Sequence, residues 1–258
     1  MPSAACVVYW YKGAQELIKT EMSEIMSNAG KDNGGRIDPA NLSNNQLELL
    51  EQYLHCQETW QEVCLVFDRD DEAGTATTLV LNRPLATKVN EDLARMLLFG
   101  QWTETNVSQT EKLVKFLNAF DNECPIYIGG PDCHGEPAML IHGIADLEGA
   151  REISPGSAIY VGGLDAAMDG VMKGKYKPLE FRFFVGKHQY SENELDIRVD
   201  VGQYQPIACA RPVALKQCIA LPKPLWHEVM ELCGGELENV STLELMKRDD
   251  LTPDNEGA

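Results

Sequence analysis

The sequence predicts an α+β fold, with a mixed β-sheet flanked by helices, and three observations support this. Apolar, strand-like runs alternate with amphipathic helical segments, but without a strict β-α-β order. Several strand-like runs are separated by turns of hairpin length, which connect antiparallel strands. Three runs end in turns rich in glycine or proline, at Leu81–Pro84, Ile128–Pro131 and Val161–Gly163, so we expect sharp turns at these strand ends.

The composition is that of a globular, acidic protein. The chain has 258 residues, of which 44% are hydrophobic, enough for one large core or two small ones. A net charge of −18 repels a phosphate backbone and disfavours nucleic-acid binding. The start lacks the pattern of a secretory signal, and no apolar run is long enough to span a membrane. The cysteines form no C-x-x-C pair, so we expect reduced thiols in a soluble, intracellular protein.

Residues 1–57 are predicted to form a helical N-terminal extension. Apolar residues recur at helical spacing in 13–29 and 43–57, on either side of a polar segment rich in glycine and asparagine. Helices outside a core must bury their apolar faces against something, so we expect this extension to contact protein partners. The rest of the chain divides into a main domain, residues 58–250, and a flexible acidic tail, residues 251–258.

The main domain is predicted to begin with a hairpin, in which strands 63–67 and 77–81 flank an acidic turn. A helix over 90–98 is expected to be capped by Asn90, and the capping box at Ser108 predicts a helix to Phe120. Further strands are expected at 125–129, 138–145, 157–161 and 179–186. Further helices are expected at 164–173, after a capping box at Ser191, and from Pro224 to Cys233.

Three motifs carry a family resemblance. An Asn-Arg-Pro at Asn82–Pro84 follows the acidic hairpin, Gly129–Pro131 precedes His142 on the next strand, and a Pro-Gly-x-x-x-Tyr-x-Gly-Gly segment covers Pro155–Gly163. The order and spacing of these motifs resemble those of the AlgH/YqgE-like family of bacteria and plastid-bearing eukaryotes. The resemblance covers roughly residues 58–235. The resemblance implies a mixed, partly barrel-like sheet flanked by helices, and a protein of the plastid stroma or the cytoplasm.

One block departs from the family pattern. Relatives carry Gly-Tyr-x-Gly-Trp before a Gly-Gln-Leu-Glu, whereas here the run is Gly186–Tyr190, followed by Asn193–Asp196. The second glycine and the tryptophan of the first block are replaced, and so is the glutamine of the second. A binding surface formed by this block in relatives is therefore expected to differ in this chain.

The resemblance implies no established reaction, and three functions stay open. The first is a non-enzymatic protein that regulates through protein-protein contacts. The second is a small-molecule or nucleotide-binding protein, or an enzyme, with a pocket near Arg83 and His142. The third is a transcriptional regulator. Candidate ligand-binding residues are Asn82, Arg83, Gly129, Gly130, Pro131, His142, Gly162 and Gly163.

Each of these candidates could bind a ligand or could have a purely structural role. Arg83 could present its planar fork to a carboxylate or phosphate, or it could pair with an acidic side chain to hold the turn. The glycines of Gly129–Pro131 permit close approach of a ligand, or they form only a tight turn. His142 lies among apolar residues, which favours a core histidine. Alternatively, its imidazole could activate the Cys133 thiol as a nucleophile.

No metal, cofactor or catalytic residue is predicted. Four residues suggest a zinc site, but their spacing does not reproduce a zinc ligand pair: Cys124, Cys133, His134 and His142. The acidic run Asp68–Glu72 lacks the glycine and the bidentate glutamate of a calcium loop. No nucleotide-binding glycine motif is present either.

Overall fold

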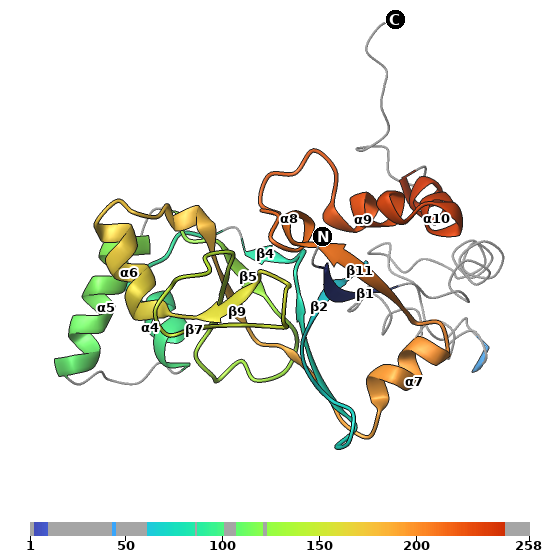
Figure 1. The fold of residues 1–258 in the computed structure, drawn as a ribbon, viewed down its shortest axis with the longest axis horizontal. Coiled ribbons are helices and arrows are strands. Elements are labelled where there is room, and N and C mark those ends of the chain that lie inside the picture. The colour runs from blue at the N-terminus through green and yellow to red at the C-terminus, as the bar shows by residue number, and fades with distance from the viewer. Residues whose placement is uncertain are drawn as a thin grey trace, which may run out of the picture.

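The structure is a computed structural model that describes residues 3–9, 43–44, 61–85, 87–100, 107–120 and 123–245. Within these ranges the chain forms two β-sheets with helices packed on them, as Figure 1 shows. The predicted α+β class is confirmed. No helix in the described ranges is both long and apolar enough to cross a membrane.

The first sheet is antiparallel, with the strand order β10-β3-β2-β1-β11. Its strands are β1 (Ser3–Tyr9), β2 (Val63–Asp70), β3 (Thr75–Val80), β10 (His188–Tyr190) and β11 (Tyr204–Ala210). The predicted hairpin is confirmed in β2 and β3. Its turn is shorter than expected, because Asp70 still pairs with Thr75 and its Oδ1 accepts hydrogen bonds from the Glu72 and Ala73 amides.

The first strand was not predicted. Residues 3–9 form β1 rather than part of a helical extension, and β1 pairs with β2 on one side and with β11 on the other. The run from Cys6 to Tyr9 contains two valines and a tyrosine, residues that favour strands. The helices predicted at 13–29 and 43–57 lie outside the described residues, apart from residues 43 and 44. The domain boundary at residue 57 stays a prediction.

The second sheet is mixed, with the order β4-β5-β9-β6-β8-β7. Its strands are β4 (Pro84–Leu85), β5 (Ile126–Ile128), β6 (Met139–His142), β7 (Ala150–Glu152), β8 (Tyr160–Gly162) and β9 (Phe181–Val185). The pair β5 and β9 is parallel, and the others are antiparallel. In the described residues each sheet has two edge strands, so neither closes into a barrel. Two open sheets that share one hydrophobic core take the place of a barrel-like sheet.

Three helices cover one face of the second sheet, namely α4 (Glu91–Phe99), α5 (Val107–Phe120) and α6 (Leu164–Met172). The ring of Phe120 meets those of Phe181 and Phe183 edge to face, with centroids 5.8 and 5.0 Å apart. Asn90 caps α4 as predicted, since its Oδ1 accepts a hydrogen bond from the Leu93 amide at 2.8 Å. The helix α5 starts at Val107, so Ser108 lies inside its first turn.

The strand β9 separates the two cores. Phe181, Phe183 and Val185 face the helices, whereas Phe184, between Phe183 and Val185, packs with Leu65 and Leu79 of the first sheet. This alternation follows from the two-residue repeat of a strand. The helix α9 (Leu225–Cys233) packs against the same core, and α10 (Gly235–Leu245) follows it, at the upper right in Figure 1. Both faces of the second sheet are therefore covered.

The other face of the first sheet is covered by α7 (Glu194–Asp200), whose Leu195 packs on Cys64, Val80 and Tyr204. This helix begins at Glu194, the last residue of the predicted capping box, and its N-cap is Asn193, which has a left-handed φ of 60°, rather than Ser191. The remaining short elements are η3 (Pro178–Glu180) and α8 (Arg211–Ala214).

Candidate functional site

The register of the first sheet places several polar side chains on the face that α7 covers. Cys64 lies opposite Val80, and His188 lies opposite Thr78. Residues directly opposite each other, and residues two apart on one strand, project from the same face of a sheet. Glu62 precedes Cys64 by two residues. Glu62, Cys64 and His188 therefore share one face, although His188 lies 126 residues after Glu62 in the chain.

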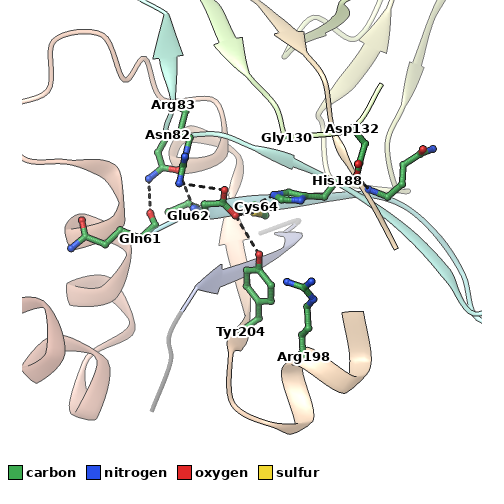
Figure 2. Close-up of polar contacts among 12 residues, drawn as sticks. Gln61, Glu62, Cys64, Asn82, Arg83, Gly130, Asp132, His188, Arg198 and Tyr204 are labelled. Atoms are coloured by element: carbon green, nitrogen blue, oxygen red, sulfur yellow. Dashed lines mark hydrogen bonds and ion pairs between the residues drawn. The ribbon is translucent and has the colours of Figure 1, made fainter. Parts of the chain in front are cut away.

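Glu62 is the centre of this group, as Figure 2 shows. Its Oε2 lies 3.2 Å from His188 Nε2 and 3.3 Å from the Tyr204 hydroxyl, and Cys64 Sγ lies 3.8 Å away. Its Oε1 lies 3.4 Å from Arg83 Nη2. Only 3% of Glu62 is exposed. A carboxylate removed from water needs such partners, because an unpaired buried charge is strongly destabilising.

Asn82 fixes the backbone on both sides of Glu62. Its Oδ1 accepts a hydrogen bond from the Val63 amide at 3.0 Å, and its Nδ2 donates to the Gln61 carbonyl at 2.7 Å. Its neighbour Arg83 meets the Glu62 carboxylate itself. One predicted motif thus positions both the backbone and the side chain of Glu62. These are the turn-holding contacts that the sequence offered as the alternative to direct ligand binding.

The glycine turn after β5 joins the two sheets. The Gly129 amide donates to the Val185 carbonyl at 2.7 Å, and the Val80 amide donates to the Gly129 carbonyl at 2.8 Å. Gly130 lies so close to Lys187 that a Cβ would fall 2.3 Å from the Lys187 carbonyl carbon. The glycines therefore allow two chain segments to cross.

A cavity of about 190 Å³ opens beside this crossing. Its lining combines four ionisable side chains with the glycine turn and apolar neighbours: Glu62, Val80, Arg83, Ile128, Gly130, Pro131, His134 and His188. A water molecule occupies about 30 Å³ of the liquid, so the cavity admits a small molecule. Of the predicted site residues, Arg83, Gly130 and Pro131 line the cavity. Asn82 and Gly129 do not line it, but their hydrogen bonds hold the backbone beside it.

The other three candidates, His142, Gly162 and Gly163, do not line this cavity. His142 is buried, with its Nε2 3.2 Å from the Gly162 carbonyl, and its Nδ1 accepts a hydrogen bond from the Ile144 amide. Gly163 packs beside Leu147. The reason is the strand order: β8 lies three positions from β5, which is roughly 14 Å at the usual strand spacing.

Comparison with known proteins identifies the domain. Residues 48–238 match the profile of the domain family described as AlgH-like. The chain belongs to the AlgH-like family. The resemblance inferred from the motifs is thereby confirmed.

Individual relatives of this AlgH-like chain are distant. It is 24% identical over 187 residues to a UPF0301 protein of Chlorobium phaeobacteroides, covering 72% of this chain and 84% of that protein. The solution structure of AlgH from Pseudomonas aeruginosa has a TM-score of 0.43 at 12% identity, covering 78% and 87% of the two chains. The crystal structure of protein DIP2367 from Corynebacterium diphtheriae has a TM-score of 0.48 at 13% identity, covering 70% and 82%.

Four residues of the site were not predicted, namely Glu62, Cys64, His188 and Tyr204. A signal for the first two was present, since both are polar and stand two residues apart at the start of an apolar strand. His188 lies in the block where this AlgH-like sequence departs from its family. Tyr204 reaches Glu62 only through the pairing of β11 with β1, which the sequence did not indicate.

Burial controls the protonation of two of these groups. It raises the pKa of the Cys64 thiol well above its usual range, and the nearby Glu62 charge raises it further. It also raises the pKa of Tyr204 far above that of an exposed tyrosine. Both groups therefore keep their protons at neutral pH and can donate to the Glu62 carboxylate. A protonated, buried thiol is a poor nucleophile.

Proposed function

We propose that this AlgH-like chain binds a small anionic molecule in the cavity beside the glycine crossing. The observation that carries the proposal is the ion pair of Arg83 with the buried Glu62 at the wall of a cavity of about 190 Å³. Glu62 holds the guanidinium from one side, and 36% of the Arg83 side chain remains exposed.

The lining favours a carboxylate or a phosphate as the recognised group. A guanidinium is planar and always charged, and its fork matches both groups. His134 and His188 add ring nitrogens to the same wall, and Ile128 and Pro131 supply apolar surface. Apolar walls lower the local dielectric, which strengthens a charge contact relative to water. The ligand we expect is a small organic acid or phosphate ester.

Thermal unfolding in the presence of small carboxylates, phosphate esters and nucleotides tests this proposal. A ligand at a hundred times its dissociation constant adds about 2.7 kcal/mol to the apparent stability, so a true ligand should raise the melting temperature clearly. The Arg83→Gln variant should lose this shift. Arg83→Lys, which keeps the charge next to Glu62 but lacks the planar fork, should show a reduced one.

Arg69 provides the matched control, because it also pairs with carboxylates, those of Asp71 and Asp196, and is 45% exposed, but lies outside the cavity. Arg69→Gln should respond to the ligand as the unmodified chain does. The proposal fails if no compound shifts the transition, or if the Arg83 variants respond as Arg69→Gln does.

A further inference from the structure

Three side chains of different chemistry meet beside the cavity, and two of them, Glu62 and His188, line it. A carboxylate oxygen of Glu62, the sulfur of Cys64 and a ring nitrogen of His188 all lie within 4.8 Å of one another. Two of the separations are 3.2 Å, from His188 Nε2 to Glu62 Oε2, and 3.8 Å, from Cys64 Sγ to the same oxygen. All three residues are buried, and Figure 2 shows their labelled side chains close together.

The separations of 3.2 and 3.8 Å lie within about 0.2 Å of those expected for ligands around one metal ion. Zinc binds nitrogen and oxygen at about 2.0 Å and sulfur at about 2.3 Å, so neighbouring ligand atoms in a tetrahedral shell are about 3.3 to 3.6 Å apart. We propose that Glu62, Cys64 and His188 bind a divalent transition-metal ion of the zinc type. This proposal goes beyond the binding of an anion and does not rest on it.

The donor set selects the class of metal. A sulfur and an imidazole nitrogen favour zinc and its transition-metal neighbours, whereas calcium and magnesium take oxygen ligands. Three protein ligands leave a fourth position in a tetrahedral shell. Since Glu62 and His188 both line the cavity, that position would face the space available to a small molecule.

Charge balance and supporting contacts are also consistent with a metal ion. On binding, the Cys64 thiol would release its proton to solvent, and the thiolate and the Glu62 carboxylate would offer two negative charges to a divalent ion, while the charge of Arg83 stays beside the carboxylate. The Tyr204 hydroxyl and the Arg83 guanidinium hold the carboxylate from outside. Such outer contacts orient metal ligands in known sites.

Cobalt titration tests the site directly. The full chain, freed of metal with a chelator, is titrated with Co²⁺ while the absorption spectrum is recorded. We expect a thiolate-to-cobalt charge-transfer band that saturates at one ion per chain and disappears when Zn²⁺ is added. Cys64→Ser should abolish this band, and His188→Gln should weaken cobalt binding by more than about tenfold, because even outer contacts typically contribute 10- to 100-fold.

Cys133 supplies the matched control. It is a free, partly exposed thiol on the loop after the glycine turn, hydrogen-bonded to Gln189. Cys133→Ser should retain the band. Tyr204→Phe, which keeps all three ligands, should retain the band with weaker binding, and this variant keeps the test valid if Cys64→Ser does not fold. The proposal is overturned if no charge-transfer band appears, if Cys133→Ser loses it, or if cobalt binds without it through surface carboxylates.

Discussion

His142 shows how one buried residue can serve structure rather than chemistry. Its ring is held between the Gly162 carbonyl and the Ile144 amide, and burial lowers its pKa below the usual 6.5, against the opposing effect of the Gly162 bond. The bond accepted from Ile144 needs a neutral Nδ1, so protonation would break it. The residue is expected to couple folding to pH.

We expect the free energy of unfolding to fall as the pH drops below about 6.5. In that range the unfolded chain takes up a proton at residue 142 while the folded chain does not, so protons favour unfolding until the lower pKa of the folded state is passed. Urea unfolding at one pH above and one below 6.5 measures this difference. His142→Gln, which lacks a titrating group, should reduce it. An unchanged pH dependence in that variant would contradict the role assigned to His142.

At the level of elements, the two sheets are joined where the turn after β5 crosses the turn after β9. Gly186 has a φ of 72°, and a Cβ there would lie 2.4 Å from the Gly130 carbonyl oxygen. The crossing places the start of β10, and with it His188, beside the cavity. A side chain at either glycine would separate the two turns.

Gly186→Ala should therefore destabilise the fold more than an alanine at a glycine with the same backbone and open surroundings. Gly202 meets this condition, with a φ of 77° and no atom within 4 Å of the point where a Cβ would lie. Both substitutions place an alanine in a left-handed conformation, at a cost of roughly 1–2 kcal/mol. The clash at Gly186 should add roughly 1–3 kcal/mol. Equal losses in urea unfolding would show that the crossing can open without cost.

Local patterns predicted most elements of the main domain, and long-range pairing explains the rest. The apolar runs of β2, β3 and β9 and the Asn90 cap of α4 depend on neighbouring residues, so they were predicted correctly. Short strands such as β7 and β10 have only three residues each and acquire their structure from their partners. The site residues divide in the same way. Arg83 was predicted because it belongs to a local motif, whereas Glu62 and His188 come together only through the pairing of strands in the folded sheet.

At the level of the whole molecule, β1 is an interior strand of the first sheet, between β2 and β11. The predicted extension of residues 1–57 therefore begins with a strand that belongs to the sheet of the main domain. Its proposed role in protein-protein contacts rests on residues 13–29 and 43–57, the segments with amphipathic spacing.

Two deletions separate these parts. Removing residues 1–57 takes away β1, which leaves β11 without its strand partner and β2 paired with β3 alone, so we expect that variant not to fold. Replacing residues 13–57 with a short flexible linker keeps β1, and the pairing of Val8 with Val63 shows that the strand ends lie close together. We expect this second variant to melt as the full chain does, measured by circular dichroism, and to lose the contacts proposed for the extension. Folding of the first variant would contradict the importance of β1.

The pairing of β1 with β11, in which Ser3 lies opposite Ala210, has a consequence for biosynthesis. The strand β1 must wait on the ribosome until β11 (Tyr204–Ala210) has emerged, because β11 is one of its two partners. Contacts so distant along the chain form slowly, and an unpaired strand invites association with other chains. The nascent protein is therefore expected to depend on chaperones until translation has passed residue 210.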